Sequence, residues 1–218
     1  MIPKKIHQIH LGGKPLPRQE TKWRETWPQH NPDWEMILWD DEKISTLHVS
    51  HPDILERCKN YSEMSDILRF EILYQYGGLY IDTDFECLQP IDPIFTGRWG
   101  GVKRGFNEDF VVYIESARAG PCGAFLASSK NNQHIKTLID NLPSREKSHG
   151  DKCAALKYGP GYLRDTLPGD VQRSLHYRKH VFPYLWNEKH RADEDFKTTT
   201  PQAYAVHHWA YSWHADNS

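Results

Sequence analysis

The chain has 218 residues, and its 27 lysines and arginines against 29 aspartates and glutamates give a formal net charge of −2. This balance excludes the basic surface expected of a nucleic-acid-binding protein or of a polybasic membrane-surface protein. Aromatic residues make up 12% of the chain and there are 13 histidines, a supply of rings that a disordered protein lacks. We therefore expect a folded protein whose rings fill a core or line a site for sugars, bases or metal.

The length predicts one domain with a single substantial core. The four cysteines are widely spaced and form no C-x-x-C pair, which indicates free buried thiols in a reducing compartment rather than a zinc site or a disulfide scaffold. No apolar segment has the length of a signal-peptide core or a membrane span. We expect a cytoplasmic protein without a transmembrane segment.

The first half of the chain predicts alternating strands and helices. Residues 5–11 predict a strand that runs into a Gly-Gly loop, and residues 19–27 predict a helix that ends at Pro28. Residues 34–39 predict a second strand, followed by a turn or helix cap at Asp40 and Asp41. This alternation favours an α/β layer fold with a largely parallel sheet.

A longer helix is predicted over residues 61–76, because Asn60 and Glu63 have the spacing of a capping box and a Gly-Gly pair follows. Residues 79–88 predict the next strand. The second half of the chain predicts strands at 110–114 and 123–127, a short helix at 134–142 and a Gly-Pro loop at 157–162.

The most informative motif is Asp82-Thr83-Asp84, which directly follows the apolar run Leu-Tyr-Ile. Residues two apart in a strand point to the same side, so both carboxylates can face one site at the carboxyl end of the strand, where ligands bind in open α/β sheets. Two adjacent carboxylates suit magnesium or manganese, usually shared with substrate phosphates. Two solvated aspartates in a turn are the alternative, but the preceding strand favours a functional pair.

Three further segments carry polar side chains suited to a site. Asp66 and Arg69 are neighbours at i and i+3 of the predicted helix, either as a surface ion pair or as a pair that reaches the next strand. The tail holds adjacent imidazoles, His207 and His208, which either complete a metal shell or pack in an aromatic strand. The first strand ends in His-Gln-Ile-His before its Gly-Gly loop. Neither G-x-G-x-x-G nor the P-loop pattern is present, which argues against a dinucleotide-binding or P-loop enzyme.

Four separated segments together resemble glycosyltransferase family 32, the group that includes yeast initiating α-1,6-mannosyltransferase and bacterial capsular sugar transferases. The core is also similar to the glucosyltransferase domains of large clostridial toxins. The segments that carry the resemblance are residues 2–13, 61–92, 159–161 and 207–213. The middle segment, with its S-D-x-L-R and D-x-D motifs, is long and specific, whereas residues 95–155 and 163–203 match loosely.

The resemblance implies a GT-A fold in one nucleotide-diphospho-sugar transferase domain, with a mostly parallel central sheet flanked by helices. It implies a metal-dependent, retaining transfer of a sugar from a UDP- or GDP-sugar to a glycan, lipid or other hydroxyl acceptor, with manganese or magnesium as cofactor. Residues 1–95 would form the donor-binding half. Residues 96–218 would form the acceptor-side half, with a C-terminal clamp for metal and diphosphate.

The resemblance also implies roles for individual residues. Asp66, Arg69, Asp82 and Asp84 are the expected catalytic residues, and the expected metal ligands are Asp82, Asp84 and one of His207 and His208, with His208 preferred. The donor would contact Gln8, Ile9, His10, Ser65, Asp66, Arg69, Asp82, Ser212 and Trp213, the last two closing over the diphosphate. Two departures from the family pattern are His10, where a tryptophan is usual, and Tyr211, where a glycine is usual.

Two alternatives belong to other functional classes. An aspartyl-phosphate phosphohydrolase has the signature D-x-D-x-[TV] after an apolar strand, but Glu86 stands at the fifth position here. A non-catalytic sugar-binding module would use the tryptophans and bind glycan without metal or nucleotide. It would need neither the D-x-D nor the S-D-x-L-R motif.

Overall fold

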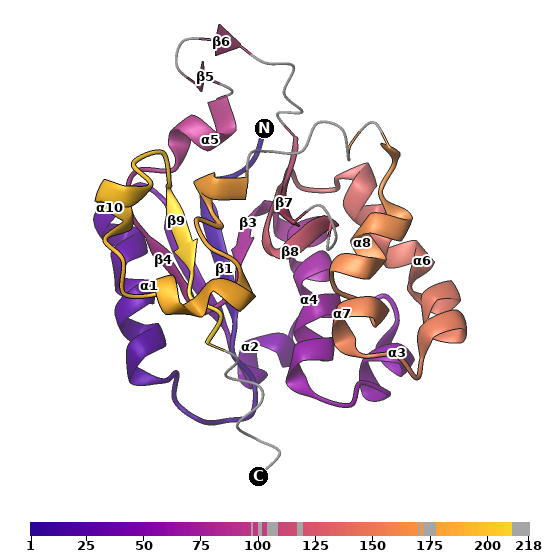
Figure 1. The fold of residues 1–218 in the computed structure, drawn as a ribbon. Coiled ribbons are helices and arrows are strands. Elements are labelled where there is room, and N and C mark those ends of the chain that lie inside the picture. Colours follow the sequence, from indigo (N-terminus) through magenta and orange to yellow (C-terminus); the bar gives the residue numbers. More distant parts are fainter. Residues whose placement is uncertain are drawn as a thin grey trace.

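A computed structural model describes residues 1–96, 98–99, 102–103, 109–116, 120–169, 171 and 178–210. Its centre is a five-stranded sheet with the strand order β2-β1-β3-β8-β7. Strands β1, β3, β8 and β7 are labelled in Figure 1. The bounds of the strands of this sheet are β1 (Lys5–Ile9), β2 (Glu35–Trp39), β3 (Gly78–Ile81), β7 (Phe110–Ser116) and β8 (Gly120–Ser128). The first three strands are parallel, and β8 and β7 continue the sheet in antiparallel order. The predicted α/β fold with a helix-flanked sheet is confirmed.

Helices and two small sheets surround the central sheet. The larger helices are α1 (Arg18–His30), α4 (Tyr61–Tyr76), α6 (Gln133–His149) and α8 (Pro160–Thr166). The shorter ones are α2 (Asp41–Ser45), α3 (Pro52–Glu56), α5 (Asp92–Thr96), α7 (Ala154–Lys157), α10 (Phe196–Thr199), η1 (Arg178–His180) and η2 (Trp186–Arg191). The small sheets pair β4 (Phe85–Cys87) with β9 (Ala205–His207) and β5 (Arg98–Trp99) with β6 (Val102–Lys103).

Two hydrophobic cores lie on the two faces of the central sheet. Leu79 and Ile81 of β3 belong to one core, whereas Tyr80 between them belongs to the other, as the alternation of a strand requires. The first core lies on the side of α1, β4 and β9, and the second on the side of α4, α6 and α8 (Figure 1). Strand β3 is therefore covered on both faces. This packing fixes the end of the strand and thus the position of Asp82, which follows it.

Helix α4 has the predicted bounds because both of its ends are capped. The Asn60 side chain accepts a hydrogen bond from the Glu63 N–H (3.0 Å), and the Glu63 carboxylate accepts one from the Lys59 N–H (3.1 Å). Gly77 ends the helix at φ 63°, where an added Cβ would lie 2.6 Å from the backbone nitrogen of Lys130. The chain then enters β3 immediately, so Asp82 comes at the carboxyl end of that strand.

Several predicted boundaries are wrong. Helix α1 continues through Pro28 to His30, because the buried Trp27 anchors its last turn and the Trp27 carbonyl accepts from the Asn31 N–H. The predicted strand 79–88 is split into β3 and β4, which pair in different sheets. The predicted loop at 157–162 contains the end of α7 and the start of α8. Pro160 is the first residue of α8, a position where the backbone N–H has no partner within the helix, so its absence costs nothing.

The four cysteines are free, as expected, but only Cys87 and Cys122 are buried, whereas Cys58 is half-buried and Cys153 is exposed. Within the described part of the chain, no helix combines the length and apolarity needed to cross a membrane.

Candidate active site

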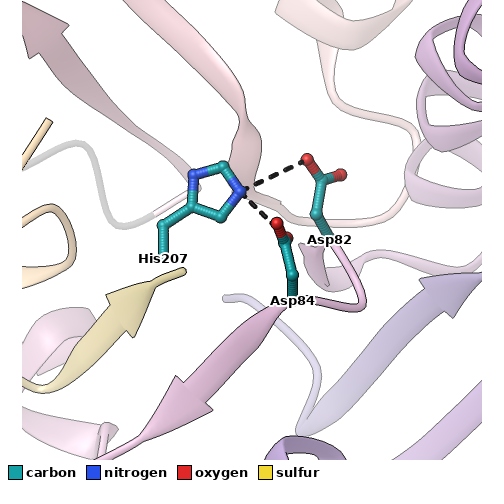
Figure 2. Close-up of side chains that lie close together, drawn as sticks. All are labelled: Asp82, Asp84 and His207. Carbon is teal, nitrogen blue, oxygen red and sulfur yellow. Dashed lines mark ion pairs between the residues drawn. The ribbon is translucent and has the colours of Figure 1, made fainter. Parts of the chain in front are cut away.

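The D-x-D motif lies in a turn between β3 and β4 rather than in a strand. The Asp82 N–H donates to the Ala124 carbonyl (3.0 Å), and the Phe85 N–H donates back to the Asp82 carbonyl (3.3 Å). Both carboxylates approach the same imidazole, since His207 Nε2 lies 2.9 Å from Asp84 Oδ1 and 4.0 Å from Asp82 Oδ2 (Figure 2). The common direction of the two carboxylates therefore comes from a turn and not from strand alternation.

Strand pairing brings His207 to this turn. Strand β9 pairs antiparallel with β4, with Phe85 opposite His207, and the two rings stack at a centroid distance of 4.5 Å. Burial favours the neutral imidazole, but the Asp84 carboxylate outweighs it and raises the pKa of His207. Burial likewise opposes ionisation of Asp84, but His207 and the Ala210 N–H (2.8 Å) hold the pKa of that carboxyl below its usual value.

Asp82, Asp84 and His207 form a candidate metal site. Each offers one ligand atom, and these atoms all lie within 4.8 Å of one another. Two carboxylates and one imidazole are a donor set that divalent cations accept. The residues present therefore fit a divalent cation.

The imidazole preferred in the sequence analysis, that of His208, does not face the carboxylates of Asp82 and Asp84. Its Nε2 lies 2.9 Å from Glu86 Oε2, and its ring stacks on Trp23 at a centroid distance of 4.1 Å. Neighbours along an extended segment point to opposite sides, so only one of two adjacent histidines can turn toward Asp84. His207, the other residue of the predicted pair, is the one that lies beside Asp82 and Asp84.

Asp66 and Arg69 join the same site from α4. Arg69 Nη2 lies 2.7 Å from Asp66 Oδ1 and 3.5 Å from Asp82 Oδ1, and both residues are buried. The alternative of a surface ion pair is therefore excluded. Burial raises the pKa of Asp66 to about 6, although Arg69 favours its ionised form. Arg69 Nε also donates to the Ser65 carbonyl (3.2 Å), which gives Ser65 a backbone contact in this cluster.

Two residues that the sequence analysis missed shape the cluster. The Tyr80 hydroxyl donates to Asp82 Oδ1 (2.9 Å), and its ring lies under the Arg69 guanidinium, 4.6 Å from Cζ. Gly123 of β8 leaves room for Arg69, because an added Cβ would lie 2.6 Å from Nη1. Tyr80 could have been found from its position two residues before Asp82, whereas Gly123 carries no local signal.

The other residues predicted to bind the nucleotide-sugar donor lie in different surroundings. The Gln8 amide is buried, with Nε2 donating to the Asp82 carbonyl (3.2 Å) and Oε1 accepting from Arg24 Nη1 (2.6 Å). Ile9 packs in the core, and His10 Nε2 lies 2.9 Å from the Lys14 carbonyl oxygen in the Gly-Gly loop. Ser212, Trp213 and the unusual Tyr211 fall outside the described residues, so their roles stay predictions.

Comparison with known proteins finds a family match over the part of the chain that carries Asp66, Arg69, Asp82 and Asp84. Residues 17–98 match the family described as the glycosyltransferase sugar-binding region containing the DXD motif. Inositol phosphoceramide mannosyltransferase 3 of Schizosaccharomyces pombe is 25% identical over 96% of this chain and 60% of its own length. The initiation-specific α-1,6-mannosyltransferase of Candida albicans is 29% identical over 77% of this chain and 51% of its own length. The chain thus spans only 51–60% of the length of these two relatives.

Solved structures show the same fold at low sequence identity. The glycosyltransferase GlyE of Streptococcus pneumoniae TIGR4 matches with a TM-score of 0.58 and 12% identity, over 97% of this chain and 55% of that one. The PaToxG glycosyltransferase matches with 0.56 and 22% identity, over 75% and 68%. The catalytic domain of the Clostridium novyi alpha-toxin matches with 0.50 and 11% identity, over 75% and 63%.

The resemblance seen in the sequence is confirmed: residues 17–98 match the family of DXD-containing glycosyltransferase sugar-binding regions, and the fold is that of GT-A glycosyltransferase structures.

Proposed function

We propose that this chain is a metal-dependent, retaining glycosyltransferase that moves a sugar from a nucleotide-diphosphate sugar to a hydroxyl acceptor. The observation that carries the proposal is the cluster at the carboxyl end of β3. There two carboxylates and an imidazole lie within metal-binding distance, and Asp82 links them to the buried Asp66–Arg69 pair. The family match and the mannosyltransferase relatives support the same reaction class.

The proposed cofactor is manganese or magnesium. Asp82, Asp84 and His207 would hold it, and when bound it supplies Lewis-acid stabilisation of the departing diphosphate. In this proposal Ser212 and Trp213 close over the diphosphate from the C-terminal side. His207 then has two functions, because it completes the ligand set and, through the pairing of β9 with β4, it anchors the segment that leads into this clamp.

Asp66 and Arg69 are the proposed sugar-binding residues. Asp66 accepts from sugar hydroxyls, Arg69 donates to them, and together they hold the ring in the orientation that the reaction needs. Arg69 also lies 3.5 Å from Asp82, so one guanidinium ties the sugar-binding side of the site to the metal-binding side. Burial of this pair excludes water and strengthens its electrostatic contacts with a bound sugar.

The relatives narrow the proposed substrates. Because the two compared relatives are named as mannosyltransferases, we propose mannose as the transferred sugar, carried by GDP or UDP. A relative named for inositol phosphoceramide supports a lipid-linked or glycan hydroxyl as the acceptor. In this scheme residues 1–95 bind the donor, and residues 96–218 form the acceptor side and contribute His207.

Retention of anomeric configuration requires either attack from the face of the leaving group or a double displacement. Proton NMR of the product formed from an α-linked donor tests retention directly. An α-linked product is expected, and a β-linked product would contradict the retaining assignment.

A donor panel tests the reaction class. The protein is incubated with manganese and a series of UDP- and GDP-sugars, and the released nucleotide is measured with and without EDTA. We expect slow, EDTA-sensitive release from one donor, a GDP- or UDP-mannose. Phosphate release from simple phosphoesters without any nucleotide would favour the phosphohydrolase alternative. Glycan binding without metal or nucleotide would favour the sugar-binding module.

A further inference from the structure

Helix α1 carries two side chains that are linked to the backbone at the two ends of the D-x-D turn, one directly and the other through Gln8. Trp27, which is fully buried, donates from Nε1 to the Phe85 carbonyl (2.9 Å), directly after Asp84. One turn earlier on the same helix, Arg24 reaches toward Asp82 through Gln8. Neither Trp27 nor Arg24 is a ligand or sugar-binding residue in the function proposed above.

Two consecutive hydrogen bonds connect Arg24 to Asp82. Arg24 Nη1 donates to Gln8 Oε1 at 2.6 Å, and Gln8 Nε2 donates to the Asp82 carbonyl at 3.2 Å. A guanidinium has only donors, so it forces the oxygen of the Gln8 amide to its own side. The amide nitrogen must then face Asp82. The charge on Arg24 therefore decides which end of Gln8 meets the turn.

Burial fixes the orientation of the Gln8 side-chain amide in these two hydrogen bonds. Gln8 is fully buried on β1, between β2 and β3, so water does not compete for its amide. Arg24 is half-buried, and its second nitrogen, Nη2, lies 3.4 Å from the Met36 carbonyl of β2. A buried amide with a wrong orientation would place two acceptors, or two donors, against each other.

We propose that Arg24 is a positioning residue of the metal site, which acts through Gln8 on the carbonyl of Asp82 and so fixes the D-x-D turn. Trp27 holds the other end of the turn at Phe85. The effect on catalysis rests on the function proposed above, whereas the effect on the turn does not. When a residue that orients a metal ligand without contacting the metal is removed, metal affinity usually falls by about 10–100-fold.

Amide hydrogen exchange of the metal-free protein tests the effect on the turn. The variants are Arg24→Ala, Arg24→Lys and Gln8→Glu, and the control is Lys22→Ala, an exposed residue on the same helix. Gln8→Glu keeps the acceptor for Arg24 but removes the donor to Asp82. We expect peptides that span residues 78–88 to exchange about tenfold faster in Arg24→Ala and Gln8→Glu. Lys22→Ala should match the wild type, and Arg24→Lys should lie between.

Manganese titration of the same four variants tests the effect on the site. The dissociation constant should rise about 10–100-fold in Arg24→Ala and Gln8→Glu, with partial recovery in Arg24→Lys. Unchanged exchange over residues 78–88, or an equal increase over β8 and α6, would overturn the proposal. If the wild type binds manganese but releases nucleotide from no donor, the proposed function fails while the exchange result still decides the role of Arg24.

Discussion

The imidazole Nε2 of His207 lies 2.9 Å from Oδ1 of Asp84, and this contact closes the candidate metal site. It exists because β9 pairs with β4 in a register that sets Phe85 opposite His207. A strand near the C-terminus therefore completes a site whose carboxylates come from the first half of the chain. The neighbouring His208 is held away by Glu86 and Trp23.

The two adjacent histidines should behave differently when each is replaced by alanine. His207→Ala removes a ligand, so the manganese dissociation constant should rise at least tenfold. His208→Ala should leave this constant nearly unchanged and lower the free energy of unfolding by about 1 kcal/mol, the usual contribution of one hydrogen bond. Calorimetry with manganese and urea unfolding measure the two effects. The reverse order of metal affinities would show that His208 is the ligand.

Arg69→Ala should destabilise the protein strongly, because it leaves Asp66 buried without its partner. The expected loss is about 3–5 kcal/mol at neutral pH. The double variant Asp66→Asn, Arg69→Met should be more stable than Arg69→Ala, since it leaves no uncompensated buried charge. Urea unfolding of both variants makes the comparison. A double variant that is less stable than Arg69→Ala would contradict the view that Asp66 depends on Arg69 for its burial.

Gly123→Ala should displace the Arg69 guanidinium, since the new methyl group would lie 2.6 Å from Nη1. The expected result is a KM for the donor raised about tenfold, which corresponds to about 1.4 kcal/mol of lost sugar binding. Steady-state kinetics with the donor found in the panel measures it. A donor KM equal to that of the wild type would mean that Arg69 does not contact the sugar in its present position.

His7 should make the stability of the protein fall between pH 7 and pH 5. Burial lowers the pKa of His7 to about 4 from its usual 6.5, although the Gly77 carbonyl favours a protonated Nε2. Its Nδ1 accepts from Trp39 Nε1 (3.1 Å), so protonation would set two donors against each other. The unfolded chain takes up this proton below pH 6.5 and the folded chain only near pH 4. The folded state therefore loses about 2 kcal/mol at pH 5 relative to pH 7.

His7→Gln removes this titration and keeps a donor for Gly77. Urea unfolding at pH 7 and pH 5 should show a smaller loss for the variant than for the wild type, by about 2 kcal/mol. Other titrating groups change both proteins alike, so the difference isolates His7. An equal loss in both proteins would mean that His7 is protonated in the folded state at pH 5.

Local signals predicted the framework of the site well. The ends of α4 were predicted because Asn60 and Gly77 act within one turn of the helix. The place of Asp82 at a strand end followed from the apolar run before it. The split of the strand at Asp82 was not predicted, because β4 is a separate strand only through its pairing with β9. Its apolar residues, Phe85 and Cys87, can equally be read as a continuation of β3.

Long-range contacts account for the remaining errors. The sequence could not choose between His207 and His208, since the choice depends on the register between β9 and β4. It also gave no reason to link Arg24 with Asp82, because their connection passes through Gln8 on another strand. In both cases the decisive partner is distant in the chain, where spacing and periodicity carry no information.

The most direct test of the account is manganese-dependent nucleotide release by Asp84→Asn. The control is Asp53→Asn, which changes an exposed aspartate of α3 that pairs with Arg57. We predict that Asp53→Asn releases nucleotide from the donor sugar at the wild-type rate. Asp84→Asn should lose the manganese-dependent release by at least about 100-fold, because it removes a charged metal ligand. Manganese-dependent release by Asp84→Asn at the wild-type rate would contradict the assignment of this cluster as the catalytic metal site.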